Sequence, residues 1–336
     1  MAVKAIENVN VSISPHIRKP ISTRRIMLDV CIALTPASIA GIIAFGWRAA
    51  VILLISVLSC VATEAVFELI TKKPLTIGDF SAVVTGLILG CNLPSTIPFW
   101  MPALGGVFAI LIVKMIFGGL GQNFMNPALA ARCFLLISFA GLMTRFPETI
   151  HTLFGADPVT TATPLAVLRD GGTVNIREML LDLHNGCIGE ASAICVLIGF
   201  VYLLVRRVIT PLIPCVYIGS TVVFVVLLQL ITGHGADLNL TFVIVQMCGG
   251  GLLLGACFMA NDYVTSPLSR TGQLIYALVL GLLTSLFRIL GSSSEGVSYA
   301  IIIGNCVVPL IDRVTIPRPF GREKEKKVRK EREGQA

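Results

Sequence analysis

A polar segment near the middle of the chain holds the side chains best suited to chemistry. It runs from Asp157 to Leu165 and reads Asp-Pro-Val-Thr-Thr-Ala-Thr-Pro-Leu. A threonine hydroxyl can carry a covalent group, although it is a poor nucleophile unless something activates it. Pro164 keeps the backbone of Thr163 extended, which favours presentation of that hydroxyl. Thr163 is therefore the first candidate for a functional side chain.

Two basic residues inside apolar stretches form the second set of candidates. Lys114 and Arg288 each stand in an apolar stretch that ends in a glycine-rich turn. Ionisable groups at membrane depth are costly, so they usually pair with another group or serve a function. These cations could contact an anionic ligand, and the alternative is a buried ion pair with an acid of the chain.

Two polar turns supply further candidates. One contains Asn123 and Asn126, and the other contains Asp262. Amides at helix N-termini bind anions and free carbonyls bind cations, so either turn could hold a ligand. The alternative is that both are simple capping turns.

The elements that position these residues are membrane spans. The chain has 336 residues, of which 55% are hydrophobic and 13% charged, with a mean hydropathy of +0.85. A soluble domain carries about 25% charged residues, so this composition predicts an all-α integral membrane protein. Segments of about 20 apolar residues can cross a bilayer. We expect about ten transmembrane helices at 26–46, 49–70, 78–93, 99–118, 126–143, 189–205, 208–231, 239–258, 273–291 and 297–312.

The spans fall into two halves that resemble each other. Thr85–Cys91 and Gly250–Cys257 have similar sequences, and each is followed by a proline-containing break and a span with one basic residue. Five spans in each half predict two inverted repeats with broken helices. The predicted divisions are a cytoplasmic N-terminal segment (1–25), a first repeat (26–143), a loop (144–188), a second repeat (189–312) and a charged cytoplasmic tail (313–336).

The distribution of charge predicts the orientation. With the N-terminus inside, 19 Lys and Arg residues lie on the inner side and 4 on the outer side, and the remaining 3 lie within spans. Positive residues are retained on the cytoplasmic side. Both termini should therefore be cytoplasmic, and the loop that carries Thr163 should be extracytoplasmic.

The ten cysteines predict neither a disulfide framework nor a metal site within this chain. No two have the C-x-x-C spacing, and most lie in predicted spans, where cysteine acts as a small apolar residue. A cysteine that helps to ligate a cluster shared with a partner protein remains the alternative. We expect the lipid bilayer, and no nucleic acid, among the partners.

Several motifs together resemble RnfD, a membrane component of the Rnf electron transport complex, and, more distantly, NqrB of the sodium-translocating NADH:quinone oxidoreductase. The resemblance extends over about residues 14–320. It rests on Ser14–Ile17, Gly119–Ala128 with Ala131 and Arg132, the Asp157–Thr163 segment, and Phe258–Pro267. The chain has Thr161 where this family often has Gly, and Asn261 and Tyr263 where it more often has Thr and Pro.

This resemblance implies a flavoprotein. FMN would be bound through a phosphoester to Thr163 by a flavin transferase, and Asp157, Thr160 and Ala162 would belong to the sequence that this enzyme recognises. Riboflavin would be a second, non-covalent flavin. Lys114, Arg288, Asn123, Asn126 and Asp262 are the candidates to hold this second flavin or an ion.

The implied function is electron relay within an ion-translocating ferredoxin:NAD oxidoreductase. Other Rnf subunits would be partners in a bacterial or archaeal plasma membrane, and the chain itself would contribute no catalytic residue. The alternative from the residues alone is an inverted-repeat channel or transporter without a redox cofactor.

Overall fold

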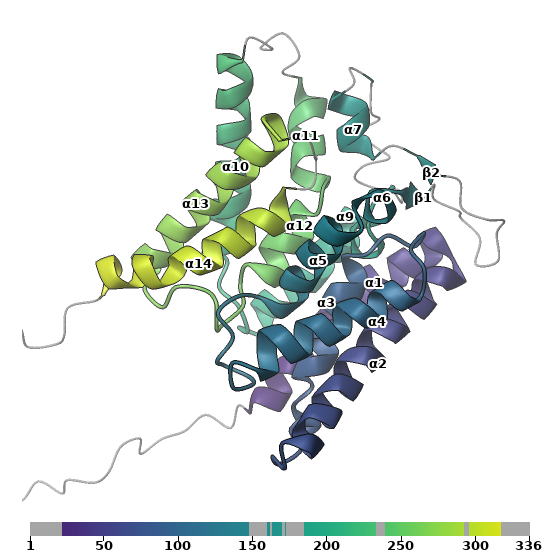
Figure 1. The fold of residues 1–336 in the computed structure, drawn as a ribbon. Helices are drawn as coiled ribbons and strands as arrows, with labels where there is room; N and C mark the ends of the chain where they lie inside the picture. Colours follow the sequence, from purple (N-terminus) through teal and green to yellow (C-terminus); the bar gives the residue numbers. More distant parts are fainter. Residues whose placement is uncertain are drawn as a thin grey trace, which may run out of the picture.

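A bundle of apolar helices makes up almost all of the structure (Figure 1), which is a computed structural model. It describes residues 22–147, 160–161, 163–169, 172, 185–232, 239–291 and 296–316. The first half contains α1 (Thr23–Phe45), α2 (Trp47–Ile70), η1 (Ile77–Asp79), α3 (Ser81–Cys91), α4 (Trp100–Val107), η2 (Phe108–Met115), α5 (Pro127–Ser138) and α6 (Ala140–Met143).

The second half is also helical. It contains η3 (Ile188–Glu190), α9 (Ala193–Val205), α10 (Leu212–Ile231), α11 (Leu240–Cys248), α12 (Leu252–Leu254), η5 (Gly255–Met259), α13 (Arg270–Ile289) and α14 (Val297–Thr315). Between the halves lie two-residue strands, β1 (Phe146–Pro147) and β2 (Thr160–Thr161), and the short helix α7 (Pro164–Arg169). The segments η1 and η3 are 3-10 helices, whereas η2 and η5 are π-helices.

The prediction of an all-α membrane protein is confirmed, with one difference in the spans. A helix lies in each of the ten predicted ranges. Among the described residues, however, five helices are long and apolar enough to cross a membrane by themselves, or six if α11 and the α12–η5 segment, bent by 53°, form one span. The other four regions are shorter. Helix α3, for example, has 11 residues, so it is about 16 Å long against a hydrocarbon core of about 30 Å.

The same helix pairing recurs in both halves. Helix α2 packs against α4 in the first half, and α10 packs against α13 in the second. At each crossing a glycine faces a serine. A Cβ atom on Gly106 would lie 2.0 Å from Ser59 Oγ, and one on Gly281 would lie 2.0 Å from Ser220 Oγ. The halves meet where α1 packs on α9 and α5 packs on α14.

Hydrogen bonds between segments that are far apart in the sequence mark two opposite ends of the bundle. At one end Arg48 donates to the Ser95 carbonyl at 3.3 Å, and Thr96 donates to the Arg145 carbonyl at 2.6 Å. We name this the Thr163 end, because β1 follows Arg145 directly and pairs with β2. At the other end, the α1 end, Tyr202 near the end of α9 donates to Asp29 near the start of α1 at 3.0 Å.

Candidate functional site

Thr163 stands at the first turn of α7. Its Oγ accepts a hydrogen bond from the Ala166 amide at 3.3 Å, and its carbonyl accepts one from the Val167 amide at 2.9 Å. Threonine is a favoured N-cap residue and proline a favoured first residue, so Thr163-Pro164 encodes this helix start. The Thr163 side chain is half-buried. Its hydroxyl therefore has a defined place on α7 and stays partly accessible.

Contacts on both sides of Thr163 hold its segment to the bundle. On the N-terminal side, β2 pairs antiparallel with β1, with Thr161 opposite Phe146 and Thr160 opposite Pro147. On the C-terminal side, Leu165 of α7 packs against Val245 of α11. Figure 1 shows β1, β2 and α7 together at one edge of the molecule. Of the other motif residues, Thr160 has a described backbone only, and Asp157 and Ala162 lie outside the described residues.

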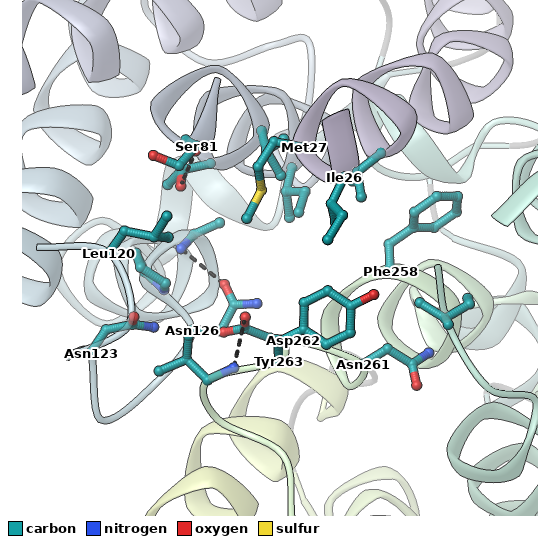
Figure 2. A pocket seen from close by; sticks show the side chains of 18 of the residues that line it. Ile26, Met27, Ser81, Leu120, Asn123, Asn126, Phe258, Asn261, Asp262 and Tyr263 are labelled. Atoms are coloured by element: carbon teal, nitrogen blue, oxygen red, sulfur yellow. Dashed lines mark hydrogen bonds between the residues drawn. The ribbon is translucent and has the colours of Figure 1, made fainter. Parts of the chain in front are cut away.

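A pocket of about 120 Å³ lies at the α1 end. Lys114, Asn123, Asn126 and Asp262 all line it, whereas Arg288 does not. Figure 2 shows Asn126, Asp262 and Tyr263 facing Ile26 and Met27 across this space. The structure thus brings together four of the five residues that were candidates to hold a second flavin or an ion, and separates Arg288 from them.

Asn126 joins the two halves below the pocket. Its Oδ1 accepts hydrogen bonds from the amides of Ala128 at 3.1 Å and Leu129 at 3.4 Å, so it caps the start of α5. Its Nδ2 donates to the Met259 carbonyl at 3.4 Å. Asn123 Nδ2 donates locally, to the Met125 carbonyl at 3.1 Å. The capping alternative therefore describes this turn, and the turn also forms a wall of the pocket.

Asp262 places an acidic group at the pocket, in the loop between η5 and α13. It accepts hydrogen bonds from the Val264 amide at 3.4 Å and the Thr265 hydroxyl at 3.1 Å. Burial raises the pKa of the Asp262 carboxyl above its usual value, and these bonds, with one from the Asn123 side chain, oppose that rise. Burial dominates because it disfavours the charged form. Asp262 is thus a carboxyl that binds its proton more tightly than a solvated one.

Lys114 forms a buried ion pair, as the alternative from the sequence proposed. It lies in the π-helix η2 and donates to Glu64 Oε1 at 2.8 Å, to Glu64 Oε2 at 2.9 Å and to Ser81 Oγ at 2.6 Å. Both charged side chains are almost fully buried. An ammonium group has three donors, and these bonds use all of them. Lys114 therefore lines the pocket as part of a neutralised pair.

Arg288 belongs to a different site, at the break between α11 and α12. It donates to Gln246 Oε1 at 3.0 Å and to the carbonyls of Gly249 at 2.8 Å and Gly250 at 3.4 Å, and it also contacts the Gln246 carbonyl. These partners are acceptors exposed by the helix break. Although Lys114 and Arg288 occupy matching places in the repeats, the structure does not bring them to one ligand.

The apolar side of the pocket was not predictable from the sequence. Its lining includes Ile26, Met27, Leu203, Val208 and Phe258. Apolar residues in a membrane helix look the same in sequence whether they face lipid, the core or a cavity, so no local signal identified them. Tyr263 was noted only as a departure from a family pattern. In the structure it lines the pocket, and its hydroxyl donates to the Val208 carbonyl.

In the part of the chain that the structure describes, no group of three or more His, Cys, Asp or Glu side chains is arranged to hold a metal ion.

Comparison with known proteins identifies the family. A family model described as NQR2, RnfD, RnfE matches residues 10–321. The chain belongs to this family. It is 48% identical over 327 residues to the D subunit of the Na⁺-translocating ferredoxin:NAD⁺ oxidoreductase complex of Acetobacterium woodii, covering 95% of this chain and 98% of that protein. The resemblance to RnfD is thereby confirmed.

Two further relatives are also D subunits, and the name of one of them gives the proton instead of sodium as the transported ion. The D subunit of the proton-translocating ferredoxin:NAD⁺ oxidoreductase complex of Clostridium ljungdahlii is 41% identical over 322 residues, covering 93% of this chain and 96% of the relative. The D subunit of the ion-translocating oxidoreductase complex of Stutzerimonas stutzeri is 36% identical over 334 residues, covering 90% and 93%. Membership of the NQR2, RnfD, RnfE family is therefore compatible with either ion.

Proposed function

We propose that this chain is the RnfD component of an ion-translocating ferredoxin:NAD⁺ oxidoreductase complex, and that it carries FMN esterified to the hydroxyl of Thr163. Family membership and near-complete coverage of the relatives named as D subunits support the first part. The position of Thr163 supports the second part. Its half-buried hydroxyl caps the start of α7, a helix that packs against the bundle. The segment also has the family's spacing of Asp, Thr, Ala and Thr.

Attachment of the flavin is a group transfer that we assign to a flavin transferase using FAD. The Thr163 oxygen forms a bond to the phosphorus of the FMN moiety, the pyrophosphate bond of FAD breaks, and AMP leaves with the hydroxyl proton on its phosphate. The residues present fit this chemistry. The Ala166 amide orients Oγ through a long hydrogen bond of 3.3 Å, which is too weak to withhold the oxygen from reaction.

The bound FMN would supply electron-transfer chemistry, and the protein would supply its position and surroundings. We place the chain in a bacterial or archaeal plasma membrane with both termini in the cytoplasm and Thr163 outside. Its partners would be the other subunits of the complex. Electron flow would be coupled to sodium or proton transport by the complex as a whole.

The pocket at the α1 end is our candidate for the second, non-covalent flavin, riboflavin. Apolar residues from α1 and α9 could cover the flat faces of the ring, and Asn123, Asn126 and Asp262 could bind its polar edge. The cavity of about 120 Å³ is smaller than the roughly 300 Å³ of a small ligand pocket. Tyr263, whose side chain is 53% exposed, would have to rotate outward to admit the ring.

Covalent attachment can be tested directly. The chain is expressed with its flavin transferase, denatured, separated on a gel and examined under ultraviolet light. The wild-type band should fluoresce and the Thr163→Ala band should not. Thr161→Ala is the matched control, because it removes a neighbouring hydroxyl and should keep the fluorescence.

A wild-type band without fluorescence, in the presence of an active transferase, would refute covalent FMN and favour a channel or transporter without a redox cofactor. The electron-transfer activity of the complex shows whether an attached flavin takes part in the reaction. If Thr163→Ala abolishes fluorescence but leaves ferredoxin:NAD⁺ electron transfer by the assembled complex intact, the flavin is not on the electron path.

A further inference from the structure

Three glycines, Gly249, Gly250 and Gly251, form the break between α11 and α12, and two features of the break favour glycine: the backbone conformation and the close packing. Gly250 and Gly251 have φ angles of +62° and +71°, which L side chains rarely adopt. A Cβ atom on Gly251 would also lie 2.7 Å from Glu190 Oε1. A Cβ atom on Gly249 would lie 2.7 Å from Leu165 Cδ1. The break is therefore a packed junction with one shape, in contact with α7 on one side.

Arg288 holds this junction from α13. Its two terminal nitrogens donate to acceptors of Gln246, Gly249 and Gly250, which are the last turn of α11 and the residues that follow it. The last carbonyls of a helix have no partner within the helix, and lipid offers none. A guanidinium group can bridge several carbonyls at once because its donors are fixed in a plane. Arg288 thus contacts one carbonyl of the last turn of α11, that of Gln246, and the two carbonyls of Gly249 and Gly250 in the break.

The same junction supports the segment that carries Thr163. Leu165 is 5% exposed and packs against Val245, one turn before Gly249. Thr163 lies two residues before Leu165 and caps the same helix through Ala166. The contacts therefore run without interruption from Arg288, through Gly249 and Leu165, to Thr163.

We propose that Arg288 is a positioning residue for Thr163. It determines the shape of the α11–α12 break, and the break determines where α7 packs on the bundle. Arg288 then acts on the group attached to Thr163 without touching it. The part of this inference that concerns a flavin rests on the proposed function, whereas the part that concerns the placement of α7 does not.

Two variants interrupt these contacts at different points. Arg288→Lys retains the positive charge but loses the planar fork, and Leu165→Ala removes the contact of α7 with Gly249. Thr284→Val is the matched control. Thr284 is fully buried one turn before Arg288 on α13 and bonds the Tyr217 hydroxyl at 2.7 Å, on the α10 side.

Hydrogen exchange of the full-length chain in membranes measures the effect on α7. Exchange of the Ala166 and Val167 amides, followed from milliseconds to minutes, should be about tenfold faster in both variants. Arg288→Lys loses charge-assisted hydrogen bonds, and Leu165→Ala loses a buried apolar contact. The double variant should exchange no faster than the more affected single variant, because both act through one junction. Thr284→Val should exchange at the wild-type rate.

The attached flavin provides the second measurement. In samples in which the gel test finds covalent FMN, its fluorescence anisotropy should fall in Arg288→Lys and Leu165→Ala but not in Thr284→Val. Unchanged exchange and anisotropy in Arg288→Lys would overturn the proposal. If the wild-type protein carries no FMN, the proposed cofactor is refuted. The role of Arg288 in placing α7 would still be decided by the hydrogen-exchange measurement.

Discussion

At the scale of single residues, the buried cations show how one sequence signal can have two structural outcomes. Lys114 and Arg288 both follow a glycine at a helix crossing, eight residues after Gly106 and seven after Gly281. Lys114 neutralises Glu64, whereas Arg288 satisfies backbone carbonyls. A compact ammonium suits one carboxylate, and a planar guanidinium suits several acceptors. Whether the cation pairs with a carboxylate or with backbone carbonyls is therefore predicted better by the residue type than by the matching position.

The buried pair leads to a prediction about stability. Lys114→Met should destabilise the protein by about 3–5 kcal/mol, because it leaves the Glu64 carboxylate buried without its counter-charge. Thermal and denaturant unfolding in detergent would measure the loss. Lys73→Met is the control, since Lys73 is exposed at the end of α2 and should change stability by less than about 0.5 kcal/mol.

The double variant Glu64→Gln with Lys114→Met separates charge from packing. It should recover most of the stability that Lys114→Met loses, because no unpaired charge remains. If the double variant is as unstable as Lys114→Met, packing rather than charge explains the loss at this site.

At the scale of elements, the helix crossings and the π-helices relate the two halves. Each half packs a glycine against a serine, Gly106 against Ser59 and Gly281 against Ser220. The single-residue difference in spacing to the cation falls in the half where that stretch is the π-helix η2. A π-helical turn accommodates an extra residue. The π-helix η2 therefore accounts for the one additional residue between the glycine and the cation in the first half. These crossings support the prediction of two repeats.

Glycine substitutions test the crossing of α10 and α13. Gly281→Ala should destabilise the protein by about 1–3 kcal/mol, because the added methyl group overpacks the crossing. Its Cβ would lie 2.0 Å from Ser220 Oγ and 3.0 Å from the Thr221 backbone nitrogen. Gly219→Ala is the matched control on α10, where a Cβ meets nothing within 4 Å. It should stabilise the helix by about 0.5–1 kcal/mol.

Unfolding midpoints of the two variants in the same detergent provide the comparison. A Gly281→Ala protein as stable as Gly219→Ala would mean that α10 and α13 separate at no cost, which would contradict close packing at Gly281.

At the scale of the whole molecule, the two candidate sites lie at opposite ends of the bundle. Thr163 follows β2 at the end where Arg145 meets Thr96, and the pocket lies where α1 begins and α9 ends. The predicted orientation places the first site outside and the second on the cytoplasmic side. The proposed covalent flavin and the proposed second flavin would then lie on opposite sides of the membrane.

Cysteine labelling in intact cells tests this orientation. In a background without reactive native cysteines, Gly172→Cys should react with a membrane-impermeant maleimide added outside, since Gly172 is exposed on the Thr163 side of the chain. Lys72→Cys, exposed at the other end of α2, should react only after the membrane is made permeable. This expectation follows from the excess of Lys and Arg on the predicted cytoplasmic side of the spans. Labelling of both positions from the same side of the membrane would refute the predicted orientation.

The amino-acid sequence was enough to predict the helical membrane class, a helix in each of ten ranges and the candidacy of Thr163, but not the helix α7 that begins beside Thr163. Composition, periodic breaks and motif spacing are local properties, and they are enough for these conclusions. The sequence could not show that Lys114 meets Glu64 across 50 residues, or that Leu165 of α7 packs against Val245 of the broken helix. Those contacts join residues far apart in the chain, and only the packing of the two halves brings them together. Thr163 was found from its neighbours in sequence, whereas the role proposed for Arg288 came from its neighbours in space.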